Sequence, residues 1–455
     1  MANKNLLTNN SKVTQVEQLY YAPVAVLPPP ISLPISTIYC FLAHIDPWDD
    51  DNNPPQPAQD QKSLKNIFKG IFAAKQIYSN DISPVIQRVD WETNVVYDYY
   101  RDDVNMFDVD GYGLLNLHFY VKNKYDQVFM CLWNNNGAVS TQEPYFQPGS
   151  YGTNNIYKGT DGYKWKYMYT IDVGLKEKFM DANWIPVPVG SNIPNPIQNS
   201  AGSGDIEVIN VLDGGSGYDP ANAAISIVIS GDGSGAAASA TVAGGVITDI
   251  VVTNAGGNYT FATASVVSDL GSGAVISVPV SPIGGHGFDP ISELGCTRAM
   301  FTAQFNGDEG GIIPTDIDYR QVGLLINPTT LSNYPNPADG SIYKTTTDLV
   351  VAPGFGSYVP DDTVFQGTSL ETATFSARVL SFDAASNVVR LINTVGTPTL
   401  NSPVFSSLTG TVRTLLSVSN PDFQTFSGYL SYVENRSGIQ RSSDGIEQFR
   451  FVLGY

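Results

Sequence analysis

The sequence has few charged residues for its length, and cationic residues are the scarcest. Of 455 residues, 15% are charged, with 24 Lys and Arg against 43 Asp and Glu, so the formal net charge is −19. Proteins that follow a nucleic-acid backbone need clustered cations to displace counterions. The composition therefore argues against a nucleic-acid partner, and it suits a protein whose surface is largely covered by other subunits.

Cysteine and histidine are also rare, with three of each. Cys40, Cys131 and Cys296 are too few and too far apart for a disulfide framework or a four-ligand zinc site. We expect them to be buried, small apolar residues. His44 precedes three consecutive aspartates at 49–51 and is the one histidine near a possible metal-ligand cluster. A solvated acidic loop explains these aspartates better, and we predict no metal site.

The chain also lacks the sequence signatures of membrane proteins, secreted proteins and common enzymes. No apolar run reaches the roughly 18 residues of a membrane span, and the N-terminus has no secretory signal pattern. A Walker loop, a nucleophile elbow and a dinucleotide fingerprint are all missing. We therefore expect a non-enzymatic protein that stays in a cytoplasm, with no catalytic residues, no cofactor and no membrane insertion.

The patterns that are present predict a mainly β protein with a few helices, of the α+β class. Residues 1–30 are polar and then proline-rich, which predicts an extended N-terminal arm. Apolar residues at three- and four-residue spacing, opposite lysines, predict one amphipathic helix over about 61–78. Runs rich in Tyr, Val and Phe predict strands within 31–45, 94–100, 114–121, 127–133 and 163–171.

The composition changes near residue 190, which suggests a domain boundary. Beyond Lys178 only one lysine remains, Lys344, and residues 201–300 hold nine acidic side chains against the single basic residue Arg298. A second β-rich stretch with almost no lysine, and with strand candidates on either side of a polar turn, covers 348–418. We expect both stretches to be all-β insertions.

The first insertion contains an internal repeat. The sequence Gly-Ser-Gly-Tyr at 215–218 returns as Gly-Gly-Asn-Tyr at 256–259 and, more loosely, as Gly-His-Gly-Phe at 285–288. The turn Gly-Ser-Gly at 233–235 likewise returns at 271–273. A period close to 40 residues with alternating segments predicts short strands joined by glycine turns, in a domain over 203–284.

Five segments, taken in order, resemble a known family. They are the apolar strand 38–45 with the following Asp46-Pro47-Trp48, Gln-Arg-Val-Asp-Trp at 87–91, Asp-Gly-Tyr-Lys-Trp-Lys-Tyr at 161–167, Tyr-Arg-Gln-Val-Gly-Leu-Leu-Ile-Asn-Pro at 319–328, and Ser-Gly-Tyr-Leu-Ser-Tyr-Val-Glu-Asn-Arg at 427–436. The chain is similar here to the baseplate wedge subunit of T-even-type contractile-tailed phages, the eighth gene product family. The likeness covers roughly 31–190, 296–345 and 420–455, and its motifs are structural.

The resemblance implies a body formed by 31–200, 285–347 and 419–455, with the two β segments as departures from the family pattern. It also implies a non-enzymatic structural protein of the phage virion, located in the tail baseplate and assembled in the cytoplasm of the bacterial host. Such a subunit forms a homodimer, binds other wedge proteins and rearranges when the tail contracts.

Large aromatic residues are the candidate packing or interface anchors, because they bury much area at low entropic cost. The candidates are Trp48, Trp91, Trp165, Tyr218 and Tyr259. An alternative hypothesis is a virion protein that binds or depolymerises carbohydrate on the host surface. That hypothesis expects Tyr218 and Tyr259 to be exposed at the tips of the repeat insertion.

Overall fold

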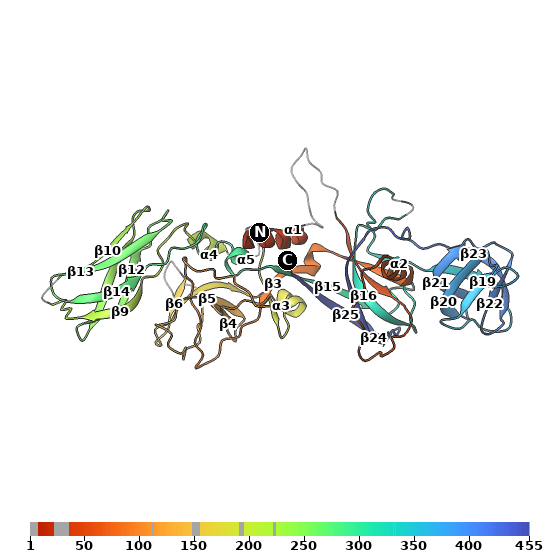
Figure 1. The fold of residues 1–455 in the computed structure, drawn as a ribbon, viewed down its shortest axis with the longest axis horizontal. Helices are drawn as coiled ribbons and strands as arrows, with labels where there is room; N and C mark the ends of the chain where they lie inside the picture. Colours follow the sequence, from red (N-terminus) through yellow and green to blue (C-terminus); the bar gives the residue numbers. More distant parts are fainter. Residues whose placement is uncertain are drawn as a thin grey trace, which may run out of the picture. The chain divides into compact units, whose positions relative to one another are not determined.

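The computed structural model describes residues 8–21, 36–111, 113–147, 155–190, 195–221, 224–330, 332 and 334–454. The fold is mostly β, with 43% strand and 10% helix, and five α-helices lie in the described part (Figure 1). The predicted class, a β-rich α+β protein with a few helices, is confirmed.

The chain divides into two compact units, each built from segments far apart in sequence. Unit 1 holds residues 1–20, 83–300 and 452–455, and unit 2 holds 21–82 and 301–451. The chain passes between the units at four places, at the end of α1 (Asn9–Tyr21) and within β3 (Ile82–Gln87), β15 (Arg298–Asn306) and β25 (Ile446–Gly454). The expected body contributes to both units, and the boundaries predicted for the two insertions stay predictions.

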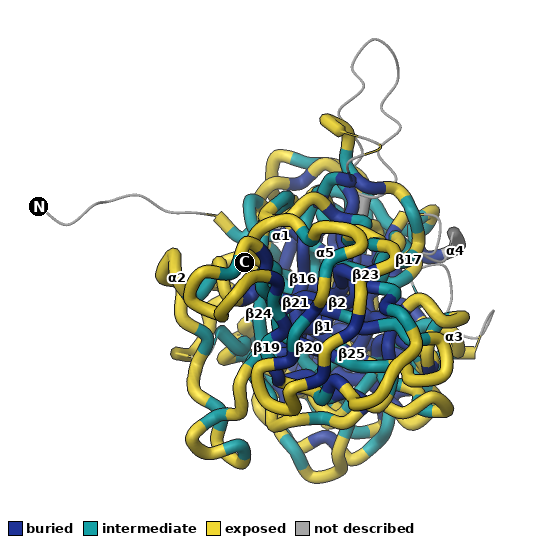
Figure 2. Tube along the Cα trace, turned by 90° about the vertical axis from the view of Figure 1, so that its right-hand side faces the viewer, coloured by how far each residue is buried: buried dark blue, intermediate teal, exposed yellow. Residues whose placement is uncertain are grey.

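Unit 2 contains a five-stranded antiparallel sheet of order β17-β2-β1-β16-β24. Its strands are β1 (Ile38–Ala43), β2 (Ile71–Ile77), β16 (Asp318–Ile326), β17 (Ile342–Lys344) and β24 (Tyr429–Gln440). Strand β1 lies in the middle and all six of its residues are buried. Figure 2 shows the buried segments, in dark blue, inside the exposed ones, in yellow. Burial on both faces explains why this strand is a continuous apolar run.

Helix α2 (Gln61–Gly70) packs on this sheet through Ile67 and begins at Asp60, whose carboxylate accepts hydrogen bonds from two backbone N–H groups. The helix is shorter than the predicted 61–78, because Ile71–Ile77 forms β2. A Cβ added to Gly70 would lie 2.6 Å from the carbonyl oxygen of His44, so this residue fits only without a side chain. Pairing with β1 overrides the helical period beyond that point.

The second part of unit 2 is a closed six-stranded barrel of order β18-β21-β20-β19-β22-β23, hereafter the barrel. Its strands are β18 (Thr347–Val351), β19 (Thr363–Gln366), β20 (Phe375–Asp383), β21 (Val388–Gly396), β22 (Pro403–Ser406) and β23 (Val412–Ser419). Apolar side chains such as Leu349 and Leu391 form its own buried cluster. Asp348 pairs with Ser419, so the barrel begins and ends at adjacent residues, as in an inserted domain.

Unit 1 contains a four-stranded antiparallel sheet of order β4-β5-β7-β6. Its strands are β4 (Tyr120–Lys122), β5 (Gln127–Trp133), β6 (Ile156–Lys158) and β7 (Lys164–Thr170), so the strand predicted at 127–133 is confirmed. The unit also contains α3 (Val173–Phe179), β8 (Trp184–Pro186), which pairs with β3, α4 (Asn195–Ser200) and α5 (Pro290–Glu293). Tyr163, Trp165 and Tyr167 are buried in one aromatic cluster.

The repeat region of unit 1 contains six strands that surround one core. They are β9 (Asn210–Ser216), β10 (Ile225–Gly231), β11 (Ala237–Ala243), β12 (Val246–Asn254), β13 (Ala262–Ser268) and β14 (Ser272–Ser277). They form three antiparallel pairs, β9 with β14, β10 with β13 and β11 with β12. Contacts of β12 with β9, β10 with β11 and β13 with β14 close the ring around small and β-branched side chains.

Helix α1 (Asn9–Tyr21) corrects the prediction of an extended arm over 1–30. The prolines at 28–30 exclude a helix at their own position but not in the proline-free segment before them. Val13 and Val16, three residues apart, are both buried on this helix. Residues 1–7 and 22–35, which include the prolines, lie outside the described part.

The strand predicted at 94–100 is wrong, and the strand predicted at 114–121 is too long. Residues 94–100 make one isolated bridge, from Val95 to Ser140, and residues before Tyr120 in the predicted strand 114–121 are irregular. Tyr97 and Val95 pack in the aromatic cluster of unit 1 all the same. Burial of aromatic and β-branched residues produced the strand-like pattern, and burial does not require a hydrogen-bonded ladder.

Candidate functional site: the charged contacts of the two insertions

The three candidate tryptophans serve internal contacts. Trp165 lies on β7 with no exposed surface, and Trp91 packs on the same aromatic cluster while its Nε1–H donates to Ser140 Oγ at 3.0 Å. Trp48 is partly exposed, and its Nε1–H donates to the carbonyl oxygen of Arg436 at 2.8 Å. The last bond ties the Pro-Trp loop after β1 to the sheet strand β24.

Tyr218 and Tyr259 are buried, with 4% and 6% of their surface exposed. The Tyr218 hydroxyl accepts a hydrogen bond from the backbone N–H of Ala274 at 3.3 Å, and the Tyr259 hydroxyl accepts one from Ala236 at 3.4 Å. Both alanines directly follow a Gly-Ser-Gly turn. The expectation of exposed tyrosines at the tips of the repeat, which belongs to the carbohydrate hypothesis, is wrong.

The glycines of the repeat explain why these rings can be buried. A Cβ on Gly271 would lie 2.6 Å from the ring of Tyr218, and a Cβ on Gly233 would lie 2.4 Å from the ring of Tyr259. The two repeated motifs are therefore two halves of one packing arrangement, in which a tyrosine lies over a glycine turn. The similar spacing of the two turns and of the two tyrosines, close to 40 residues in each case, was the sequence signal for this pairing.

Lysines of unit 1 hold the acidic repeat region in place. The cations that make these contacts form a lysine cluster, which contains Lys158 of β6 and Lys164 and Lys166 of β7. Alternation along β7 directs Lys164 and Lys166 to the face opposite Trp165. Lys166 Nζ lies 2.7 Å from Glu207 Oε1, and both side chains are almost completely buried, at 0% and 3% exposure.

Asp249 of β12 is the second acidic partner of this cluster. Lys164 Nζ lies 3.1 Å from Asp249 Oδ1, and Lys158 pairs with the other carboxylate oxygen. Burial lowers the pKa of Lys164. Burial acts to raise the pKa of Asp249, but the two lysines lower it more, so the net shift of the Asp249 pKa is downward. Lys164 Nζ also donates to the carbonyl oxygen of Ile209 at 3.2 Å. The lysines that precede the repeat region in the sequence therefore pair with the acidic side chains inside it.

In unit 2 a chain of seven alternating charges connects the barrel to the five-stranded sheet. We call it the ion-pair chain; in order it contains Asp46, Arg378, Asp361, His44, Asp318, Arg320 and Asp51. Arg378 and Asp361 come from the barrel, Asp318 and Arg320 from β16, and the two ends from the loop after β1. The predicted solvated acidic loop is thus partly paired with arginines.

His44 is the central residue of this chain and is 4% exposed. Its Nδ1 lies 2.8 Å from Asp318 Oδ1, and its Nε2 lies 2.7 Å from Asp361 Oδ1. Burial lowers the pKa of His44, but the hydrogen bonds to the two carboxylates raise it more, so its net shift is upward. The hydrogen bond from His44 lowers the pKa of Asp318, and His44 and Arg378 lower that of Asp361 against the effect of burial. Sequence reasoning considered His44 for a metal and missed its position between the carboxylates of Asp318 and Asp361.

Two cavities adjoin the ion-pair chain. One has a volume of 590 Å³ and the other 430 Å³, and they share Asp46, Pro47, Arg378 and Asn393 as lining residues. The larger cavity is lined mainly by polar side chains, among them Gln56, Asn66, Gln321, Asn393 and Asn435. The contact between the barrel and the sheet is therefore bordered beside the ion-pair chain by an open, polar depression.

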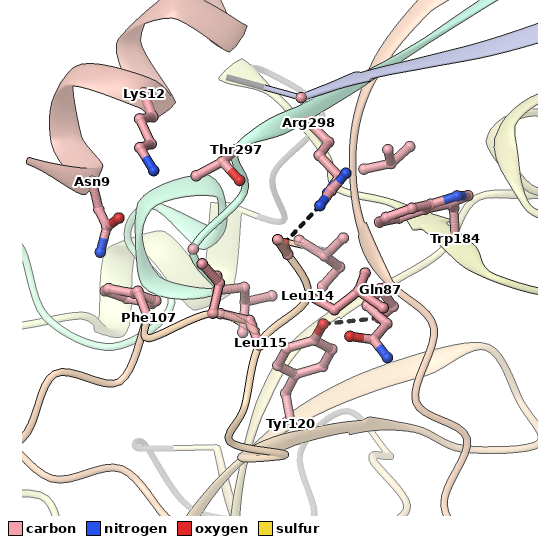
Figure 3. A pocket seen from close by; sticks show the side chains of 17 residues that line it. Asn9, Lys12, Gln87, Phe107, Leu114, Leu115, Tyr120, Trp184, Thr297 and Arg298 are labelled. Carbon is pink, nitrogen blue, oxygen red and sulfur yellow. Dashed lines mark hydrogen bonds between the residues drawn. The ribbon is translucent and has the colours of Figure 1, made fainter. Parts of the chain in front are cut away.

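Unit 1 has a smaller cavity of 250 Å³, shown in Figure 3. Asn9 and Lys12 of α1 line one side, and Arg298 lies over the ring of Trp184, 4.9 Å from its centroid. Arg298 also donates to the carbonyl oxygen of Gly113 at 2.6 Å, and burial lowers its pKa. These contacts satisfy the guanidinium within the fold, and they do not form a nucleophile and base arrangement.

Within the described residues, no three His, Cys, Asp or Glu side chains lie together in a group that could hold a metal ion. Cys40, Cys131 and Cys296 are free and buried, as expected. No described helix is long and apolar enough to cross a membrane. No protein-family model and no curated protein matches this chain.

Proposed function

We propose that the protein is a structural subunit of a phage tail baseplate, a wedge protein that dimerises, binds other wedge proteins and rearranges when the tail contracts. It acts in the virion, after assembly in the cytoplasm of the bacterial host, and it needs neither catalysis nor a cofactor. The proposal starts from the resemblance of five sequence segments to the T-even-type wedge family.

One observation carries the proposal. Three of the five family-like segments, at 38–48, 319–328 and 427–436, form the adjacent strands β1, β16 and β24 with their connecting loops. The hydrogen bond from Trp48 to Arg436 joins the first of these segments to the last. Segments separated by almost the whole chain thus form one structural element, which favours a shared fold over chance likeness.

The packing of the two insertions supports an assembly role as well. The repeat region is held by the lysine cluster and the barrel by the ion-pair chain, so both insertions have defined positions on the parts of the unit beside them. Shape and charge complementarity between fixed surfaces are what a subunit of a symmetric assembly needs. The buried repeat tyrosines leave the carbohydrate hypothesis without the surface it required.

The test is the mass of the purified full chain in solution, measured by sedimentation equilibrium at several concentrations. We expect twice the mass of one chain, and we expect larger complexes when other tail proteins of the same phage are added. A chain that stays monomeric and binds no baseplate component would overturn the proposal.

A further inference from the structure

The contact between the barrel and the sheet of unit 2 has the chemistry of a reversible latch. We propose that His44 is a pH-sensitive latch, which holds the barrel on the five-stranded sheet while its imidazole is protonated and releases it when the imidazole is neutral. This inference rests on the contacts within unit 2 and does not depend on the proposed baseplate function.

The two ring nitrogens of His44 face acceptors from two different parts of the unit. Nδ1 is 2.8 Å from Asp318 Oδ1 and 2.9 Å from the Asp318 carbonyl oxygen, both on β16, whereas Nε2 is 2.7 Å from Asp361 Oδ1 of the barrel. An imidazolium donates from both nitrogens, but a neutral imidazole donates from only one. Loss of the proton therefore leaves a nitrogen lone pair against an oxygen in a site that is 4% exposed.

The charged groups around His44 come from every element packed beside it. Asp318 and Arg320 belong to β16, Asp361 and Arg378 to the barrel, Asp46 and Asp51 to the loop after β1, and Lys69 of α2 lines the adjoining cavity. Arg378 and Arg320 are each bound by two carboxylates. Without the His44 proton, Asp318 and Asp361 face each other across a neutral ring, and their repulsion acts to separate the barrel from the sheet.

The surroundings allow the barrel to move once the latch is released. The barrel has its own apolar cluster, separate from that of the sheet. Open depressions of 590 and 430 Å³ lie beside the ion-pair chain, so the barrel and the sheet do not fill the space on that side of the contact. The chain enters and leaves the barrel at the paired residues Asp348 and Ser419, a narrow connection that can act as a hinge.

The latch has two pH limits. The pKa of His44 is raised in the fold, so its stabilising contribution is complete below the unfolded value and disappears as the pH rises through the raised value. The pKa values of Asp318 and Asp361 are lowered, so their contribution disappears as the pH falls through those lowered values. His44 therefore holds the barrel between these two limits, and its contribution is lost as the pH rises through its raised pKa.

The test measures a distance across the contact in the full chain. Spin labels are attached to Lys65→Cys on α2 and Ser369→Cys on the barrel, both at exposed positions, while the three native cysteines are buried. Pulsed electron paramagnetic resonance then gives the distance distribution at about pH 6 and about pH 9. We expect a narrow distribution at the lower pH and one at least roughly twice as broad at the higher pH.

Two variants and one matched control complete the experiment. His44→Gln should give the broad distribution at both pH values, because the amide cannot carry the charge. Asp361→Asn, at a half-exposed position, should do the same if His44→Gln fails to fold. His286→Gln changes another buried histidine beside a carboxylate, Glu293 in unit 1, and should leave the pH response intact. A distribution that is unchanged by pH, or a pH response that persists in Asp361→Asn, would overturn the latch.

Discussion

Gly271 shows how a missing side chain determines the packing of the repeat region. Its φ is +94°, and a Cβ there would lie 2.6 Å from the ring of Tyr218. The glycine thus provides both the left-handed backbone and the space for the ring. The corresponding contact of Gly233 with Tyr259 shows that the repeat in the sequence encodes a repeated ring-on-turn contact.

We predict that Gly271→Ala lowers the free energy of unfolding of the repeat region by about 2–4 kcal/mol, through backbone strain and overpacking. Gly244→Ala is the matched control, since its φ is +61° and no atom lies within 4 Å of the added Cβ. It should cost only about 1 kcal/mol. Urea unfolding followed by tyrosine fluorescence measures both, and equal losses would show that the contact with Tyr218 is unimportant.

Strand β7 shows how one element can support two different contacts. Its alternation puts Trp165 in an aromatic cluster and Lys164 and Lys166 against the acidic repeat region. Glu207 Oε2 is buried and has no hydrogen-bond partner, so the charge of Glu207 depends on Lys166. A buried ion pair of this kind is costly to break on one side only.

We predict that Lys166→Met lowers the free energy of unfolding by about 3–5 kcal/mol, because Glu207 is left buried and unpaired. The double variant Lys166→Met, Glu207→Met should recover to within about 1 kcal/mol of the unchanged protein. Lys158→Met is the control, since the Lys158 side chain is 51% exposed, and its loss should cost less than about 1 kcal/mol. Denaturant unfolding monitored by tryptophan fluorescence gives all three values. A double variant as unstable as Lys166→Met would contradict the argument.

At the scale of the whole molecule, the barrel and the repeat region each begin and end at neighbouring residues, as the prediction of two insertions expects. Asp348 pairs with Ser419 at the base of the barrel, and Asp205 and Ser281 exchange hydrogen bonds at the base of the repeat region. The two regions differ in the side chains that would lose their charged partners if each region were removed. In the barrel contact Asp46 is largely exposed and Asp361 is half exposed, whereas the repeat region neutralises buried lysines.

We predict that replacing 349–418 by a short glycine linker leaves a folded, soluble chain. Removing 206–280 in the same way should destabilise unit 1 unless Lys164 and Lys166 are also changed to Met, because deletion leaves both ammonium groups without Asp249 and Glu207. Circular dichroism and hydrogen exchange of β1 and β5 measure folding. A repeat deletion that is equally stable with and without the lysine changes would refute the prediction.

The sequence by itself determined the β-rich class, the strand at 127–133, the burial of the three cysteines and the glycine repeat, because these depend on local composition and short periods. It did not determine the end of α2 at Gly70, helix α1, or the irregular path of 94–100, since long-range pairing or burial decides each of them. The lysine cluster and the ion-pair chain join residues far apart in the sequence, such as His44 and Asp361, which are 317 positions apart. Only the tertiary structure could bring these charges together, and it shows that the basic residues of the lysine cluster and the ion-pair chain contact carboxylates of the same protein.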